Sequence, residues 1–219
     1  LEFHGAVPVS KLRREPLERA VNRALKRGFD IVFSLLVITL VFTWLFPILA
    51  ILVKLSSRGP VFFKQMRVGK DGREFEFYKF RSMYHERSDA NADRQTTRDD
   101  DRITRVGRFI RKTSLDELPQ LLNVFLGSMS MVGPRPHATA TKAAGVLFEY
   151  AVSEYSARHR VNPGITGWAQ LCYPYGASEQ DAKQKLQFDL YYVKNHSIFL
   201  DFMITLTTVE VVLFGKGAR

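Results

Sequence analysis

"IVFSLLVITLVFTWLFPILAILV", the segment from Ile31 to Val53, is a run of 23 residues without a charged side chain. A helix of this length can cross a hydrocarbon core of about 30 Å. The run is too long for the apolar part of a cleaved signal peptide, and no small-residue cleavage site follows it. The segment therefore predicts a helix that enters a membrane.

Basic residues flank this segment on both sides, which bears on its topology. Lys and Arg are frequent between residues 11 and 27 and again between residues 54 and 73. Because cations favour the cytoplasmic side, both ends of the segment are expected there. Pro47 removes a backbone donor and clashes with the carbonyl of residue 43, which kinks or breaks a helix. A single straight span is the ordinary alternative, but we favour a re-entrant hairpin that bends near Pro47.

Composition limits the partners without identifying one. The chain of 219 residues carries 32 Lys and Arg against 22 Asp and Glu, a net charge of +10. This charge predicts an anionic partner, which leaves nucleic acid, anionic lipid and phosphorylated substrates open. The single cysteine, Cys172, excludes an intramolecular disulfide and fits a reducing compartment.

After the apolar segment, the sequence has the pattern of a domain that lies at a surface. Residues 61–80 alternate apolar and polar side chains on both sides of Gly69-Lys70-Asp71-Gly72, which predicts a β-hairpin. Residues 85–101 are polar, and they include three consecutive aspartates at 99–101, so a solvated loop is expected.

Two later segments have the pattern of amphipathic helices. Residues 102–112 suit an anionic bilayer surface, although a solvated helix face over an ordinary core fits equally well. The segment Ile198 to Phe214 has an apolar stripe opposite polar residues, so it either lies in the membrane interface or covers a core. The basic residues of the first segment are Arg102, Arg105, Arg108 and Arg111, and the polar residues of the second are Asp201, Thr205 and Thr208.

Two adjacent carboxylates stand out in "SLDELPQLLNVFLGSMSMVGPRP", residues 114–136. One interpretation of Asp116 and Glu117 is structural, because Ser114 and Glu117 have the spacing of a helix capping box. That interpretation does not explain Arg135, which lies between two prolines that stiffen its backbone. A rigid arginine near two acids is suited to receive a phosphate while the acids and a metal ion carry out chemistry.

Four motifs, in this order behind one proline-containing apolar helix, resemble those of a known family. They are "KFRSM" (79–83), the 114–136 stretch, "HRVNPGITGWAQ" (159–170) and "FDLYYVKN" (188–195). The chain resembles the bacterial sugar transferases, the monotopic polyprenyl-phosphate phosphoglycosyl transferases that initiate exopolysaccharide and O-antigen assembly. The resemblance extends from about residue 25 to the C-terminus.

The resemblance implies an α+β, membrane-associated fold. The chain would then consist of a basic N-terminal segment (1–24), a re-entrant membrane helix (25–57) and a cytosolic catalytic domain (58–219). The catalytic domain would be built from amphipathic interfacial helices and a small β-hairpin or sheet. Family members break the re-entrant helix at a Ser-Pro step, which Pro47 matches, although Phe46 stands in place of the serine. Longer relatives carry an additional N-terminal membrane bundle, and its presence in this protein is left open.

The resemblance also implies a reaction. Asp116 would attack the sugar-bearing phosphate of a UDP-hexose, releasing UMP, and undecaprenyl phosphate would then take the phosphosugar from Asp116. Glu117 would help to hold Mg²⁺, and Lys79 and Arg135 match active-site positions of the family. The other residues predicted to bind substrate are Arg67, Arg81, Arg111 and Asp189, with a surface cation as the alternative for Arg67 and Arg111 and a structural hydrogen bond for Asp189.

The expected location is the cytoplasmic face of the bacterial inner membrane, with UDP-hexose, undecaprenyl phosphate and inner-membrane lipids as partners and no nucleic acid. The alternative is a membrane-anchored, non-catalytic binder of anionic lipid or nucleic acid. It explains the charge and the anchor but not Asp116 and Glu117 beside Pro-Arg-Pro. The identity of the hexose, with glucose and galactose favoured, and the oligomeric state, with a homodimer as one option, are left open.

Overall fold

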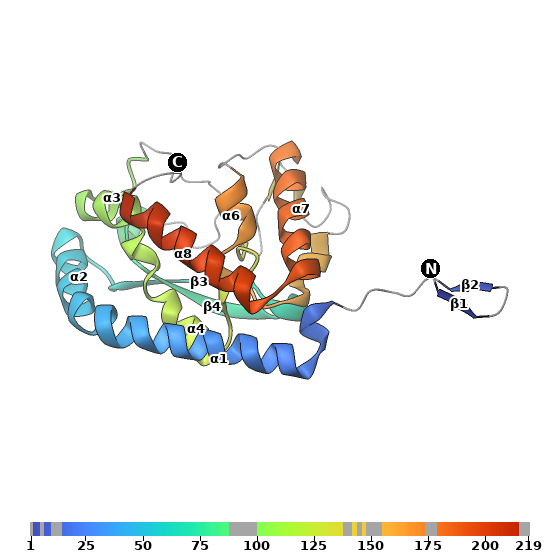
Figure 1. Ribbon diagram of the computed structural model, residues 1–219. Helices are drawn as coiled ribbons and strands as arrows, with labels where there is room; N and C mark the ends of the chain where they lie inside the picture. Colours follow the sequence, from blue (N-terminus) through green and yellow to red (C-terminus); the bar gives the residue numbers. More distant parts are fainter. Residues whose placement is uncertain are drawn as a thin grey trace.

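The computed structural model describes residues 2–4, 7–9, 15–87, 100–137, 142–143, 146–147, 155–173 and 179–214. Within them, helices and short two-stranded sheets form a mixed α+β arrangement (Figure 1). Two of these sheets are short antiparallel pairs, β1 (Glu2–His4) with β2 (Val7–Val9) and β6 (Lys142–Ala143) with β7 (Val146–Leu147). Residues 88–99, most of the predicted solvated loop, lie outside the described residues.

A helix of 37 residues, Ala20–Ser56, follows the short helix η1 (Pro16–Glu18) and contains the apolar segment. Among the described residues it is the one helix long and apolar enough to cross a membrane. It consists of α1 (Ala20–Val37), the π-helical turn η2 (Ile38–Phe42) and α2 (Thr43–Ser56). Figure 1 shows α2 turning away from the line of α1. The predicted long apolar helix is therefore present, with its direction changing between α1 and α2.

The change of direction precedes Pro47 and has a local cause. The backbone N–H of Thr43 donates to the carbonyl of Ile38, and the Thr43 hydroxyl donates to the same oxygen at 2.8 Å. Pro47 lacks the N–H that would donate to the Thr43 carbonyl. Wide π-turns are a common site of kinks, so the preceding turn accommodates the proline.

The predicted β-hairpin is confirmed. Strand β3 (Phe62–Val68) pairs antiparallel with β4 (Glu74–Phe80), and η3 (Lys70–Gly72) connects them. Asp71, with φ 55°, and Gly72, with φ 74°, both adopt the left-handed conformation that tight turns require. Phe46 of α2 stacks on Phe80, with ring centroids 5.8 Å apart. The residue that stands in place of the family's serine therefore fixes α2 to the hairpin.

Helix α3 (Arg105–Lys112) is shorter than the basic series in the sequence. Thr104 caps it by accepting a hydrogen bond from the Gly107 N–H at 2.8 Å. The prediction that Arg102 belongs to this helix face, and that Asp100 is solvated, is wrong. The two are buried and form an ion pair of 2.6 Å before the helix begins. The arginine fork neutralises the aspartate, which permits both to leave water.

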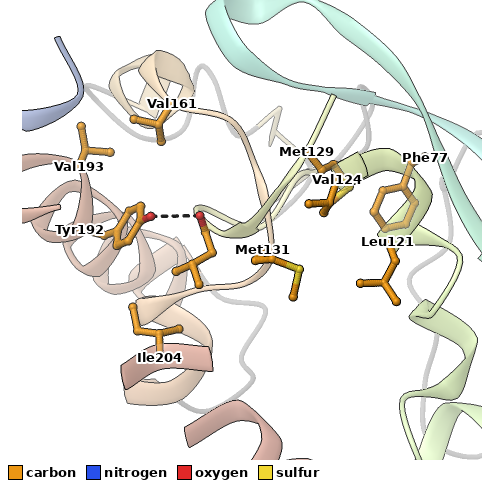
Figure 2. Close-up of a cluster of buried hydrophobic side chains, with 10 residues drawn as sticks. Phe77, Leu121, Val124, Met129, Met131, Val161, Tyr192, Val193 and Ile204 are labelled. Carbon is orange, nitrogen blue, oxygen red and sulfur yellow. Dashed lines mark hydrogen bonds between the residues drawn. The ribbon is translucent and has the colours of Figure 1, made fainter. Parts of the chain in front are cut away.

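The remaining elements surround the main core. Figure 2 shows apolar side chains from β4, α4, β5, α7 and α8 in one cluster, with Tyr192 on the side of α7 and α8 and Phe77 on the opposite side. The hydroxyl oxygen of Tyr192 lies 3.0 Å from the Val132 carbonyl oxygen. Strands β5 and β8 pair in parallel, with Ser130 opposite Gly164 and Val132 opposite Thr166. The elements in chain order are η4 (His85–Arg87), η5 (Leu115–Glu117), α4 (Gln120–Leu126), β5 (Ser130–Val132), η6 (Tyr155–Arg160), β8 (Gly164–Thr166), α6 (Trp168–Cys172), α7 (Glu179–Asn195) and α8 (Ile198–Phe214).

Helices α1 and α8 bury polar side chains and expose apolar ones. On α8, Asp201 and Thr205 are buried, whereas Leu206 is 49 % exposed. On α1, Asp30 is buried, whereas Val32 is 66 % exposed. This is the reverse of a helix on a water-soluble protein, and it is the arrangement expected where the outer face meets lipid. Of the two alternatives for the C-terminal helix, the exposed stripe favours the membrane interface.

Candidate active site

Asp116 and Glu117 lie in the short helix η5, in the turn between α3 and α4. Ser114 precedes them with φ 56°, a left-handed conformation that is uncommon for a residue with a side chain. Its hydroxyl makes no capping hydrogen bond, so the capping box proposed as the structural alternative is not formed. The Glu117 carboxylate is instead engaged by cations from elsewhere in the chain.

Lys79 connects the two carboxylates. It extends from β4, and its Nζ lies 2.6 Å from Glu117 Oε1 and 3.6 Å from Asp116 Oδ2. The neighbouring residue of the strand is held by α4, because the Tyr78 N–H donates to Asn123 Oδ1 at 3.2 Å. Asn123 thus fixes the strand that carries Lys79 to the helix that follows Asp116 and Glu117.

Arg135 reaches the same glutamate from the segment that follows β5. Its Nη2 lies 2.5 Å from Glu117 Oε1, and its Nη1 lies 3.5 Å from Oε2. The side chain is 39 % exposed, against 18 % for that of Glu117. The four motif residues Lys79, Asp116, Glu117 and Arg135 therefore converge, with Arg135 at the solvent side of the cluster.

Arg67 supports the Arg135 segment from strand β3. Its Nη1 donates to the Pro136 carbonyl at 2.6 Å, and its guanidinium lies over the Phe77 ring, 4.6 Å from the ring centroid. Burial lowers the pKa of Arg67 to about 10, and the nearby charge of Arg135 acts in the same direction. Arg67 remains a cation at neutral pH, so it adds positive charge next to Arg135.

The two carboxylates have opposite pKa shifts. Burial raises the pKa of Asp116, although the Lys79 ammonium acts to lower it. Burial acts to raise the pKa of Glu117 as well, but Arg135 and Lys79 outweigh it and hold that pKa well below its usual range. Glu117 is therefore an ionised group committed to its cations. Asp116 is the less strongly paired of the two carboxylates.

Arg111 and Arg81, two further residues predicted to bind substrate, are placed differently. Arg111 is exposed at the end of α3, and its positive charge acts to lower the pKa of Asp116. Arg81 is buried and donates to backbone carbonyls at the C-terminal end of α2, those of Val53, at 3.1 Å, Ser57, at 2.7 Å, and Arg58. Val53 lies in the last turn of α2, and Ser57 and Arg58 follow its last residue, so the structure uses Arg81 as a helix cap.

Asp189 is also separate from the carboxylate pair. It lies buried on α7, and its Oδ2 is 2.9 Å from Nη2 of Arg158, a residue of η6. The structural alternative for Asp189 thus has a defined partner. The sequence analysis did not identify Arg158 as a functional residue. The signal for it is the run of basic residues Arg158-His159-Arg160, in which Arg158 directly precedes the third motif.

The donor groups at the carboxylates fit a magnesium ion that is shared with substrate. Among the described residues, no three or more His, Cys, Asp or Glu side chains gather into a metal site. Mg²⁺ commonly needs only one or two carboxylates, because waters and substrate phosphates complete its coordination. Asp116 and Glu117 provide adjacent carboxylate oxygens, and within the described residues the contact of Glu117 Oε2 is a long one, 3.5 Å from Arg135 Nη1.

Comparisons with known proteins test the resemblance that the motifs suggested. The model of the family described as "Bacterial sugar transferase" matches residues 21–215. The undecaprenyl-phosphate glucose phosphotransferase of Komagataeibacter xylinus is 46% identical over 100% of this chain and 41% of its own length. The exopolysaccharide production protein PSS of Rhizobium leguminosarum bv. phaseoli is 48% identical over 90% of this chain and 100% of its own length.

The UDP-glucose:undecaprenyl-phosphate glucose-1-phosphate transferase of Escherichia coli K12 is 44% identical over 100% of this chain and 46% of its own length. The chain thus spans less than half the length of two of these relatives and the whole length of the third. The resemblance stated from the motifs is confirmed, and the chain belongs to the bacterial sugar transferase family.

Proposed function

We propose that this protein transfers a hexose-1-phosphate from a UDP-hexose to undecaprenyl phosphate and thereby initiates the assembly of a polysaccharide. The observation that carries the proposal is the pairing of two unlike carboxylates. Asp116 is buried and weakly paired, and Glu117 beside it is clamped by Lys79 and Arg135. The names of the relatives supply the substrates, undecaprenyl phosphate and UDP-glucose.

The reaction consists of two displacements at one phosphorus atom. A carboxylate oxygen of Asp116 attacks the sugar-bearing phosphorus of the UDP-hexose. The bond between this phosphorus and the oxygen that bridges the two phosphates breaks, and UMP leaves with that oxygen and the electron pair. A phosphate oxygen of undecaprenyl phosphate then attacks the same phosphorus, and the Asp116 carboxylate leaves. Direct attack of one phosphate on another would face anionic repulsion in a single step, and the covalent intermediate divides that barrier.

The cations of the site have a defined use in this scheme. Lys79 and Arg135 neutralise the charge that develops on the transferred phosphoryl group, and Arg67 and Arg111 are proposed to bind the diphosphate. We propose that Glu117, with Asp116 beside it, holds Mg²⁺, which when bound adds further charge neutralisation. Arg81 and Asp189 are left out of the substrate contacts, because their charged groups are engaged by α2 and by Arg158.

We also propose that residues 25–57 form a re-entrant hairpin in the cytoplasmic leaflet of the inner membrane and that residues 58–219 are the cytosolic catalytic domain. The turn from α1 into α2, the cations on both flanks and the exposed apolar faces of α1 and α8 support this topology. A polyprenyl phosphate keeps its head group at the bilayer surface, where it could reach a carboxylate at the edge of the membrane.

The test is the covalent step. Purified protein given UDP-glucose or UDP-galactose with Mg²⁺, but no lipid, should release at most one UMP per active site and gain the mass of a hexose phosphate on Asp116. Addition of undecaprenyl phosphate should remove that mass. The variant Asp116→Asn should show neither the added mass nor turnover, because the amide is not a nucleophile.

Asp71→Asn, in the exposed hairpin turn, is the matched control and should behave as the unaltered protein does. A folded Asp116→Asn protein that turns over at an undiminished rate would show that Asp116 is not the nucleophile. A complete absence of UMP release from the unaltered protein would instead favour the non-catalytic lipid binder.

A further inference from the structure

Arg158 is a buried arginine that contacts the backbone of the Arg135 segment. Its Nη2 donates to the Arg135 carbonyl at 2.7 Å, and its Nη1 donates to the Tyr155 hydroxyl at 2.9 Å. The same Nη1 lies 2.7 Å from Nδ1 of His137, two residues after Arg135. Arg158 thus touches the backbone on one side of Pro136 and a side chain on the other.

Asp189 makes this burial possible. A buried guanidinium without a partner is strongly unfavourable, and Asp189 provides the opposite charge at 2.9 Å. The side chains of both residues are only 4 % exposed, so the pair lies inside the domain. The fork of arginine allows one side chain to bind the carboxylate and the Arg135 carbonyl together.

The segment that follows Arg158 holds the same stretch of chain by its backbone. The Gly133 N–H donates to the Thr166 carbonyl at 2.9 Å, and the Gly164 N–H donates to the Pro134 carbonyl at 2.9 Å. A Cβ atom on Gly164 would lie 2.1 Å from the nitrogen of Gly133, so only glycine permits this approach. The third sequence motif is therefore a backbone cradle for the Pro-Arg-Pro segment.

We propose that Arg158 is a positioning residue for Arg135 and that Asp189 of the fourth motif acts by anchoring Arg158. This inference rests on the proposed function, in which Arg135 acts on the transferred phosphate. The Arg135 side chain is partly exposed and meets Glu117 only if its backbone is held in place. A misplacement of about 1 Å can reduce a rate by roughly 100-fold. Arg158 fixes the carbonyl from which that side chain departs.

The test is Arg158→Lys. Lysine keeps a positive charge for Asp189, which protects the fold, but its ammonium lies one bond nearer to the backbone than Nη2 and cannot maintain all the contacts of the fork. The kcat/KM for UMP release should fall by about 10- to 100-fold. Arg160→Lys is the matched control, because Arg160 lies two residues away with its side chain 63 % exposed. It should leave kcat/KM unchanged.

A double-mutant cycle distinguishes positioning from general stability. In an Arg135→Lys background the guanidinium that Arg158 positions is absent, so Arg158→Lys should reduce kcat/KM by less than about threefold further. A full multiplicative loss in the double variant, or an undiminished rate in Arg158→Lys alone, would overturn the inference.

Amide hydrogen exchange separates this inference from the proposed function. Peptides that span residues 133–137 should exchange faster in Arg158→Lys than in Arg160→Lys, while peptides that contain Asp116 exchange at the same rate in both. If the unaltered protein released no UMP, the proposed function would fail, and the exchange rates would still test the hold of Arg158 on Arg135. Equal exchange at residues 133–137 in both variants would refute the inference regardless of activity.

Discussion

Two clusters in this molecule each place one lysine beside two carboxylates. They differ in the number of hydrogen bonds that their carboxylates accept from other groups of the protein. Lys79 lies 2.6 Å from Glu117 and 3.6 Å from Asp116. Lys26, on α1, lies 2.9 Å from Asp201 on α8 and 3.6 Å from Asp30. The geometry around the two lysines is nearly the same, so the difference in use must come from the surroundings.

The Lys26 cluster is saturated with hydrogen bonds. Asp30 accepts from the Ser130 hydroxyl and from the Met131 N–H, both at 2.9 Å. Asp201 accepts from the Tyr192 hydroxyl at 2.7 Å, and Lys26 also donates to the Val132 carbonyl at 2.9 Å. All three side chains are at least 90 % buried, at 10 %, 3 % and 0 % exposed for Lys26, Asp30 and Asp201. The cluster joins α1, β5 and α8, and its side chains are closed off from solvent.

The Lys79 cluster is open by contrast. Within the part of the chain that the structure describes, the one charged contact of Asp116 is Lys79 at 3.6 Å. The cluster also extends to a partly exposed arginine, Arg135. Paired acids beside a lysine are therefore not a sign of catalysis by themselves. The features that distinguish the candidate active site are a weakly paired carboxylate, Asp116, and a cluster that reaches solvent through Arg135.

Replacement of each lysine by methionine should separate the two clusters most strongly. Lys26→Met leaves two buried carboxylates without their cation, so the free energy of unfolding should fall by about 3–5 kcal/mol. Lys79→Met leaves Glu117 paired with Arg135 and removes from Asp116 only a contact of 3.6 Å, so the loss should be smaller, about 1–2 kcal/mol. Its kcat should fall by about 100-fold or more, because the variant lacks a cation that we propose stabilises the transferred phosphate.

The measurement is thermal unfolding in one detergent or nanodisc, together with UMP release at a temperature at which each variant is folded. The comparison fails if Lys79→Met is destabilised as much as Lys26→Met. It fails equally if folded Lys26→Met loses as much activity as Lys79→Met.

The sequence alone could predict the site better than it could predict the structural cluster. Asp116 and Glu117, adjacent in the chain, and Lys79 and Arg135, each within a motif, were identified and do converge. Lys26 was interpreted only as a flanking cation of the apolar segment, because its partner Asp201 lies 175 positions away in the sequence numbering. Local patterns carry no information on such contacts.

The same limit explains the errors. Arg81 is separated from Lys79 by one residue, so both were assigned to substrate, but Arg81 reaches the end of α2 instead. Arg102 is the first of a series of arginines spaced three residues apart, but it forms an ion pair with Asp100 before the helix begins. The apparent capping box at Ser114 failed because Lys79 and Arg135 took the Glu117 carboxylate. In each case a tertiary contact outweighed a local pattern.

The pH dependence of stability offers a smaller and more specific test of the open cluster. The pKa of Glu117 is held below its ordinary value of 4.5 by Arg135 and Lys79. Its ionised form therefore stabilises the folded state above about pH 4.5, and this stabilisation is lost as the pH falls further. Glu117→Gln should lose less stability than the unaltered protein between about pH 5 and pH 3.

Asp116 should have the opposite effect, because burial raises its pKa above the ordinary value of 3.8. The folded state binds its proton more tightly than the unfolded state does, so ionisation of Asp116 reduces stability as the pH rises from about 4 through the raised pKa. Asp116→Asn should therefore be at least as stable as the unaltered protein at pH 7. Melting temperatures measured from pH 3 to pH 8 test both predictions. If the melting temperature of Glu117→Gln fell between pH 5 and pH 3 as steeply as that of the unaltered protein, the prediction for Glu117 would be contradicted.

The smallest expected effect comes from removing one hydrogen bond of the saturated cluster. Ser130→Ala deletes the hydroxyl that donates to Asp30, but Asp30 keeps the Met131 N–H and lies near Lys26. Since no buried charge is left unpaired, the cost should be about 1 kcal/mol, a fall of roughly 2–4 °C in melting temperature for a chain of this size. Strand β5, which carries Ser130, leads directly into the segment of Arg135, so this variant also measures whether the two clusters communicate. If they are independent, kcat/KM for UMP release should stay within about twofold of the unaltered protein. A loss of more than about tenfold in a fully folded Ser130→Ala protein would show that the saturated cluster sets the position of Arg135 through β5.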